Sequence, residues 1–170
     1  MKKAAVVAES HSVFSMHKDP FSLFGLPISL FVHMPTLNER YQALMKDLHP
    51  DQFFGADAFM KQSAEHLVAY ANQAYKNLQS PIKCAEEALK AKGWKIPDSD
   101  QPTTTDKVML MEMMELQEMA QNGEDIRPFY QDCILNIESA LLKDNQDQAE
   151  STFRRLKFIA RLLGNIEDSK

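Results

Sequence analysis

Apolar side chains recur at helical spacing in two long segments of the N-terminal half of the chain. In the first segment they form one apolar stripe, made of Leu37, Tyr41, Leu44 and Leu48. In the second segment they recur at steps of three and four, at Met60, Ala64, Leu67, Ala71, Ala74 and Leu78. Alanine at half of those positions allows two helix backbones to approach closely, so the pattern predicts an antiparallel helical hairpin.

Start and stop signals bound the first helix of this hairpin. Thr36-Leu37-Asn38-Glu39 has the form of a capping box, and Pro35 directly ahead of it stops any earlier helix. The helix is expected to end at His49, because Pro50 cannot continue the hydrogen-bond ladder and disfavours helical geometry in the residue before it. Residues 48–53 then form a polar break at the exposed tip of the hairpin, a good position for recognition.

Shorter elements flank the hairpin. The segment 21–27 is a compact apolar turn, in which Gly25 and Pro27 end a helix of little more than one turn. Ser80-Pro81 is a helix-start pair, and Gly93 suits the C-terminal cap of the helix that follows. Residues 95–105 are rich in turn formers and have no periodicity, so we expect a linker there between two domains.

Three further helices are predicted after the linker, over residues 106–121, 128–143 and 145–165. The inner stripe of the middle helix consists of Tyr130, Ile134, Ile137 and Leu141. That of the last helix consists of Ala149, Phe153, Leu156, Ala160 and Leu163. The breaks between the helices are short, which makes the helices antiparallel neighbours in a three-helix bundle.

Two helices of this bundle carry more apolar surface than a bundle core needs. On the first, Met109, Met113, Leu116 and Ala120 share the face predicted as core. A second face holds Leu110, Met111 and Met114 beside Glu115 and Glu118. On the last helix, Phe158 and Leu162 project opposite the core stripe. These residues either fill gaps in the core or pack on the first domain, or they form an acid-rimmed binding surface for a partner with a basic and apolar patch.

Composition supports an all-α protein and narrows its partners. The 170 residues include only five glycines but ten methionines, and no run of alternating β-branched residues occurs. A formal net charge of −5 argues against binding to nucleic acid, and no apolar run is long enough to cross a membrane. Residues 1–19 show no helical stripe and are interpreted as a mobile tail.

Cysteine and histidine usage gives no sign of a disulfide framework, a metal site or another cofactor. Cys84 and Cys133 sit singly within helical patterns, as small core or half-buried residues of a reducing compartment would. The histidines outside the polar break, which are His11, His17, His33 and His66, have no paired ligand spacing. We therefore expect a cytoplasmic protein without a bound metal.

The polar break contains His49-Pro50-Asp51, a tripeptide that is weak evidence alone, because Asp51 could be a helix N-cap and His49 a solvated loop residue. Its setting changes this. A helix with Arg40 and Lys46, then His-Pro-Asp, an aromatic residue and a long alanine-rich helix resembles the J-domain of co-chaperones that activate DnaK-class ATPases. The Leu-Phe-Gly-Leu-Pro opening and His-Pro-Asp-x-Phe resemble the HscB branch, the co-chaperones of iron–sulfur cluster assembly.

The HscB resemblance implies a J-domain over residues 20–94 that docks on an HscA-type, DnaK-class ATPase. In such a J-domain, Asp51 would offer a carboxylate to a chaperone arginine, His49 a directional hydrogen bond, and Pro50 a fixed backbone. Arg40 and Lys46 would steer the approach to an acidic surface.

The resemblance extends to the bundle, residues 106–165. Leu110-Met111-Glu112-Met113-Met114-Glu115-Leu116-Gln117-Glu118 is similar to the segment with which HscB-type proteins hold the scaffold IscU. It implies scaffold contacts by the side chains of Leu110, Met111, Met114, Glu115, Glu118 and Phe158.

The chain departs from the family pattern at several positions near these sites. Leu48 stands where tyrosine is usual, Gln52 where lysine is usual, and Asp47 where a polar or basic residue is usual. Asn122 replaces a further acidic residue. Because rim charges mainly tune encounter rate and salt dependence, we expect a weak or highly selective J-domain, not an inactive one.

The expected function is that of an adaptor with no catalytic residues of its own, which stimulates the chaperone ATPase and delivers the scaffold. Two alternatives stay open at this point. One is a general J-protein for another client. The other is a helical metal-dependent hydrolase that uses His49 and Asp51, which we consider much weaker because a metal site needs three or more converging ligands.

Overall fold

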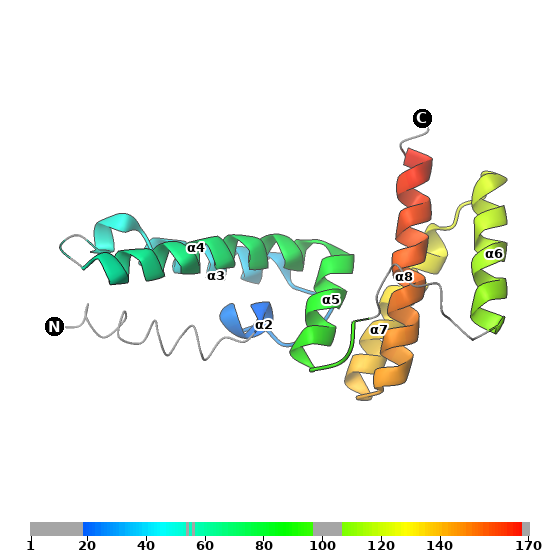
Figure 1. The fold of residues 1–170 in the computed structure, drawn as a ribbon, viewed down its shortest axis with the longest axis horizontal. Coiled ribbons are helices and arrows are strands. Elements are labelled where there is room, and N and C mark those ends of the chain that lie inside the picture. The colour runs from blue at the N-terminus through cyan, green and yellow to red at the C-terminus, as the bar shows by residue number, and fades with distance from the viewer. Residues whose placement is uncertain (1–18, 54, 56, 97–106, 168–170) are drawn as a thin grey trace. The chain divides into compact units, whose positions relative to one another are not determined.

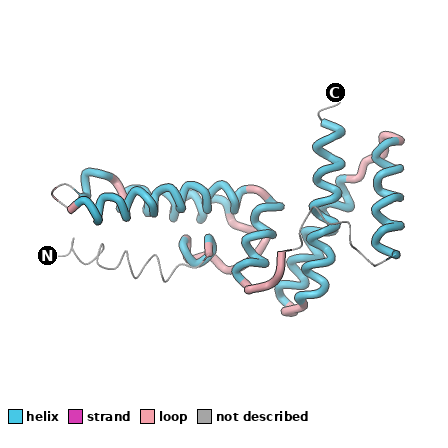
Figure 2. Tube along the Cα trace, in the orientation of Figure 1, coloured by secondary structure: helices cyan, strands magenta, loops and turns pink. Residues whose placement is uncertain are grey.

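The computed structural model describes residues 19–53, 55, 57–96 and 107–167, and of residues 165–167 it describes the backbone only. All regular elements within these residues are helical, and Figure 2 draws no strand among them, so the predicted all-α fold is confirmed. The chain divides into two compact units, Met1–Ala91 and Lys92–Lys170. Nearly all of the predicted tail (1–19) and linker (95–105) lies outside the described residues.

The first unit contains α2 (Pro20–Leu23), α3 (Met34–Asp47), the 3₁₀ turn η1 (Pro50–Phe53), α4 (Ala58–Gln79) and α5 (Pro81–Ala91). Figure 1 shows α3 and α4 side by side along their length, with α5 turned across the end of α4. Helix α2 packs against both α4 and α5. The largest fully buried side chains of this unit are Phe21, Leu37, Leu89 and Cys84.

The α3–α4 hairpin is held by the predicted stripes and by polar bonds that sequence periodicity does not reveal. All the alanine and leucine positions of the second stripe are buried, which are Ala64, Leu67, Ala71, Ala74 and Leu78. The Tyr41 hydroxyl donates to Asn72 Oδ1 at 2.6 Å, and the Tyr75 hydroxyl donates to Asn38 Oδ1 at 2.7 Å. The two tyrosine rings stack with centroids 4.2 Å apart. These contacts fix the register of the two helices.

The predicted bounds of α3 are wrong at both ends. The helix begins at Met34, with Pro35 inside its first turn, where the missing amide of proline breaks no helical hydrogen bond. Thr36 is therefore not a cap; its hydroxyl lies 2.7 Å from His33 Nδ1. The helix ends at Asp47 and not at His49, because Leu48 already leaves helical geometry as the C-cap.

The second unit contains α6 (Lys107–Gln121), α7 (Arg127–Leu142) and α8 (Gln146–Glu167), the predicted three-helix bundle. Helix α8 packs on both other helices, most extensively on α7. The buried hydrophobic residues of this unit are Leu116, Ile126, Cys133, Ile137, Ala140, Leu141, Ala149, Phe153, Leu156 and Ile159.

The core stripe predicted for α8 is correct in its first half and drifts in its second. Ala149, Phe153 and Leu156 are fully buried, but the next core residue is Ile159, and Leu163 is half-buried. A strict alternation of three and four departs from the 3.6-residue turn as a helix lengthens. Helix α7 also exposes Leu135 and Leu142, which periodicity did not mark.

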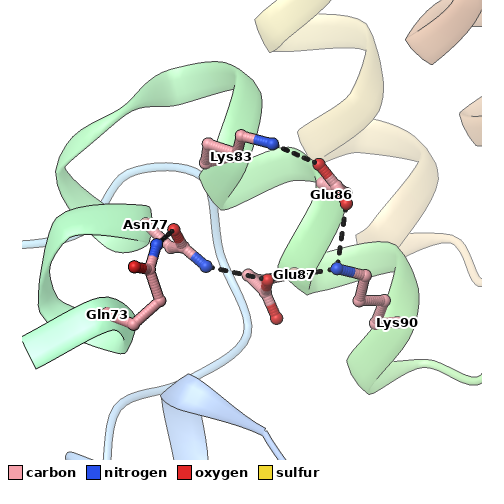
Figure 3. Close-up of polar contacts among 6 residues, drawn as sticks. All are labelled: Gln73, Asn77, Lys83, Glu86, Glu87 and Lys90. Carbon is pink, nitrogen blue, oxygen red and sulfur yellow. Dashed lines mark hydrogen bonds and ion pairs between the residues drawn. The ribbon is translucent and has the colours of Figure 1, made fainter. Parts of the chain in front are cut away.

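A polar cluster joins α4 to α5 at the far end of the hairpin from its tip (Figure 3). The Asn77 amide donates to Glu87 Oε1 across the junction at 3.0 Å. Lys90 Nζ lies 2.9 Å from Glu86 and 3.2 Å from Glu87, and Lys83 Nζ lies 3.2 Å from Glu86. Burial raises the pKa of the Glu86 carboxyl, but hydrogen bonds and charges from the two lysines outweigh it, so the pKa is lowered.

Candidate partner-binding sites

The tip of the hairpin is anchored on both sides by buried side chains. Leu48 and Phe53 are 8% and 7% exposed and pack in one cluster with Ala64 and Leu67 of α4. Between these anchors the chain makes a tight turn, in which the Gln52 amide donates to the carbonyl of His49 at 2.9 Å. A short segment held at both ends presents its side chains in a fixed arrangement, as a recognition loop requires.

His49, Pro50 and Asp51 all lie exposed in this turn, as the sequence predicts. The side chains of His49 and Asp51 are 58% and 87% exposed, and His49 Nδ1 lies 3.4 Å from Asp51 Oδ2. The Asp51 amide also donates to His49 Nδ1 at 3.3 Å. The imidazole and the carboxylate are therefore neighbours on one solvent-facing corner, where a partner can reach both groups.

The interpretation of Asp51 as a helix N-cap is wrong. The N-cap of α4 is Asp57, whose Oδ1 accepts a hydrogen bond from the Met60 amide at 2.7 Å. The carboxylate of Asp51 is thus not committed to starting a helix.

The two basic residues predicted to steer a partner differ in their surroundings. Arg40 Nη1 donates to the carbonyl of Phe24 at 2.6 Å and also to the carbonyl of Gly25. Its guanidinium thus closes the C-terminal end of α2, where the carbonyls attract a positive charge. Lys46 is exposed in the last turn of α3, next to the tip.

The outer face of α6 is exposed as the sequence predicts. Leu110, Met111 and Met114 are 40%, 64% and 71% exposed, and Glu115 and Glu118 are also exposed. Leu116 on the opposite side is buried, which confirms the predicted rotation of the helix. The result is a row of large apolar side chains with carboxylates beside it.

Val108 extends this row and was missed from sequence. It is 66% exposed and lies three residues before Met111, one helical turn away. That spacing is the signal that could have identified it. We call the set Val108, Leu110, Met111 and Met114, with Glu115 and Glu118, the α6 face.

Phe158 on α8 is predicted to project from the bundle, but its side chain is half-buried. The guanidinium of Arg161 lies 5.5 Å from the centroid of its ring, a cation–π contact that covers part of it. The side chain therefore sits at the edge of the core, with part of its ring available to a partner.

Metal-ligating residues are not gathered at either site. Among the described residues, no three His, Cys, Asp or Glu side chains are close enough together to hold a metal ion. Cys84 and Cys133 are buried thiols that form no disulfide, and burial raises the pKa of the Cys133 thiol to about 11. Within the described part of the chain, no helix combines the length and the apolar character needed to span a membrane.

Similarity to known proteins extends over nearly the whole chain, although no protein-family model matches it. A relative named co-chaperone protein HscB homolog, from Vibrio vulnificus strain YJ016, is 34% identical over 161 residues, which cover 86% of this chain and 94% of the relative. The protein of the same name from Pasteurella multocida strain Pm70 is 30% identical over 162 residues, covering 88% of this chain and 94% of that protein.

Solved structures of HscB proteins resemble this fold. The chaperone HscB from Vibrio cholerae superposes with a TM-score of 0.73 at 29% identity, covering 89% of this chain and 97% of that one. The human co-chaperone protein HscB superposes with a TM-score of 0.73 at 25% identity, covering 89% of this chain and 82% of that one.

Proposed function

Since the chain belongs to the HscB family of co-chaperones, we propose that it stimulates the ATPase of an HscA-type, DnaK-class chaperone and delivers an IscU-type iron–sulfur scaffold to it. The observation that supports this most directly is that two exposed sites of different chemistry lie on separate units. One is the His49-Pro50-Asp51 tip of the first unit, and the other is the α6 face of the second. No catalytic chemistry by this chain is needed.

At the tip, the proposed chemistry is polar recognition of the ATPase. Asp51 offers a carboxylate that can accept charge-assisted hydrogen bonds from an arginine, and His49 beside it offers a directional bond. Pro50 limits the backbone between them, which lowers the entropy lost when the partner binds. Lys46 adds a positive charge that speeds the encounter with an acidic surface.

On the second unit, the proposed scaffold contact is apolar at its centre and acidic at its edge. Met111 and Met114 offer large, adaptable side chains that fit a hydrophobic patch. Glu115 and Glu118 select a partner whose patch is bordered by basic residues. The exposed part of the Phe158 ring contributes from α8.

A protein that binds both partners at once couples scaffold capture to ATP hydrolysis through proximity alone. When the scaffold is bound to the second unit, it is kept near the chaperone at a raised effective concentration, so capture of the scaffold and ATP hydrolysis are stimulated together. We place this activity in the cytoplasm, where the two buried thiols stay reduced.

Titration of a purified HscA-type ATPase with this protein, with and without an IscU-type scaffold, tests the proposal. We expect ATP hydrolysis to rise with the protein and to rise further when the scaffold is added. His49→Gln should lose the stimulation and keep scaffold binding, whereas His66→Gln, the same change at an exposed position of α4, should behave as the unchanged protein. Equal stimulation by the His49 and His66 variants would refute the role of the tip.

The scaffold contact needs its own test, because a J-protein for a different client would also stimulate an ATPase. Met114→Ala is expected to weaken scaffold binding by about tenfold while ATPase stimulation in the absence of scaffold is kept. Phe158→Ala should weaken it less, since part of that ring is covered. Recovery from cell extract of a different client, unaffected by Met114→Ala, would favour the general J-protein.

A further inference from the structure

The helix that carries most of the proposed scaffold contact has little hydrophobic anchorage of its own. Leu116 is the one buried residue of α6, and Met109, Met113, Met119 and Ala120 are half-buried. By contrast, α7 buries four residues, which are Cys133, Ile137, Ala140 and Leu141. Because methionine side chains adapt to many packings, such a surface fixes the rotation of α6 weakly.

A charged pair connects this weakly anchored helix, α6, to α8. Arg155 Nη1 of α8 lies 3.3 Å from Glu112 Oε2 of α6, and the two side chains are 32% and 43% exposed. The Arg155 Nε atom is buried and has no hydrogen-bond partner among the described groups. The base of the guanidinium is thus held in the seam between the helices while its outer nitrogen reaches the carboxylate.

The position of the pair relates it to the proposed scaffold contacts. Glu115 follows Glu112 by three residues, and Phe158 follows Arg155 by three residues, so each is one helical turn from the pair. The ion pair therefore joins the two helices one turn before Glu115 on α6 and one turn before Phe158 on α8.

We propose that Arg155 is a positioning residue, which through its ion pair with Glu112 fixes the rotation of α6 and so holds the α6 face and Phe158 in one surface. This inference rests on the proposed function and adds the residue that preorganises the scaffold site. A site held in its binding geometry before the partner arrives loses less entropy on binding. If α6 rotates, only a fraction of the molecules presents the surface, and the apparent affinity falls by that fraction.

Cys133 provides a reporter of the pair that does not involve the scaffold. Its thiol on α7 is 2% exposed, and its raised pKa results first from burial, while Arg155 acts in the opposite direction and Asp132 and Glu112 act in the same direction as burial. The thiol thus lies within the electrostatic reach of both members of the pair. When α6 moves away from α8, this thiol should become accessible.

The test compares Arg155→Leu with Arg154→Leu, the same change at the exposed neighbouring position. Scaffold affinity is measured by calorimetry, and Cys133 reactivity by N-ethylmaleimide labelling with peptide mass mapping, which separates it from Cys84. For Arg155→Leu we expect the Kd for the scaffold to rise about two- to fivefold. We expect the labelling of Cys133 to become faster, because the gain in exposure of the thiol outweighs the rise in its pKa that loss of the Arg155 charge causes. Arg154→Leu should change neither.

A charge exchange distinguishes positioning from a general loss of stability. The double variant Glu112→Arg with Arg155→Glu restores the pair with opposite polarity, and we expect tighter scaffold binding than either single variant shows. Unchanged affinity and unchanged labelling in Arg155→Leu, or no recovery in the exchange, would overturn the inference. Since labelling needs no scaffold, a chain that fails to bind the scaffold at all would refute the proposed function while the labelling still tests the pair.

Discussion

The hairpin tip and the α6 face are built in different ways, although both are exposed sites proposed to bind proteins. The tip is a polar turn fixed by Leu48 and Phe53, on a hairpin whose helices are cross-linked by two tyrosine–asparagine hydrogen bonds. The α6 face lies on a helix with one buried residue, Leu116, and an ion pair to α8. The tip is held in place by the hairpin beneath it, whereas the α6 face depends on the Glu112–Arg155 pair.

This difference shows how each kind of recognition depends on the part of the protein that supports the site. A directional hydrogen bond loses strength when donor and acceptor are misplaced, so the polar tip needs a rigid base. Apolar contact is non-directional and tolerates small displacements, so methionines on a loosely held helix can still bind. We therefore expect mutations in the supporting core to affect the two units separately and to different extents.

The largest effect is expected from emptying the core beneath either site. Leu37→Ala should lower the free energy of unfolding of the first unit by about 2–5 kcal/mol, and Leu156→Ala that of the second by a similar amount, because both side chains are fully buried. Hydrogen exchange measured by mass spectrometry would assign each loss to a unit. Leu142→Ala, at an 80% exposed position, should change little and serves as the control.

If Leu37→Ala raised amide exchange equally in both units, the chain would unfold as one cooperative body. The tip and the α6 face would then not be supported independently of each other.

The next effect tests the tip alone. Asp51→Asn keeps the shape of the side chain and removes its charge, so we expect the concentration for half-maximal ATPase stimulation to rise about 10- to 100-fold, with scaffold affinity unchanged. Asp47→Asn, in the last turn of α3, is the matched control. It removes an acid from a helix C-terminus, where negative charge is unfavourable, and should not weaken stimulation. A similar loss in both variants would mean that net charge, and not the carboxylate of Asp51, matters.

The sequence predicts those features of the two sites that depend on residues close together in the chain. His49-Pro50-Asp51 and the apolar row of α6 could be predicted, because one is a contiguous string and the other has helical spacing. The rotation of α6 was correct, with Leu116 buried and Met111 and Met114 exposed. Both properties are local in sequence, and local patterns are what a single sequence records.

Contacts between distant residues could not be predicted. The bond from Arg40 to the carbonyl of Phe24 spans 16 residues, and the Glu112–Arg155 pair joins different helices. Nothing in the spacing of such residues indicates that they meet. The start of α3 was misplaced because Thr36-x-x-Glu39 imitates a capping box, while Pro35 is equally suited to a first helical turn.

A smaller effect distinguishes Arg40, whose charge stabilises the fold, from Lys46, whose charge speeds association with the ATPase. Arg40→Leu should lower the free energy of unfolding of the first unit by about 1–2 kcal/mol, because it leaves the carbonyls of Phe24 and Gly25 without their donor. Lys46→Leu should leave stability within about 0.5 kcal/mol and instead slow association with the ATPase, more so at low salt. Urea denaturation and stopped-flow binding measure the two quantities. Equal stability of both variants would show that Arg40, like Lys46, acts mainly on the encounter.

The smallest effect concerns the polar junction of α4 and α5, which supports the hairpin from the end opposite its tip. The lowered pKa of Glu86, below its ordinary value of 4.5, means that the folded state favours the ionised carboxylate. Its contribution is therefore present at neutral pH and is lost as the pH falls through the folded-state pKa. Glu86→Gln should cost about 0.5 kcal/mol at pH 7, the size expected of a partly solvated pair, and less at pH 3.

Urea unfolding of the first unit at both pH values measures this difference. Glu65→Gln, at an exposed position of α4, is the matched control. A cost for Glu86→Gln as large at pH 3 as at pH 7 would mean that the side chain stabilises the junction by packing and not by its charge. The first unit would then owe its rigidity to its apolar contacts and tyrosine–asparagine bonds, and the contrast with the α6–α8 seam, where a charged pair is proposed to set the geometry, would be sharper.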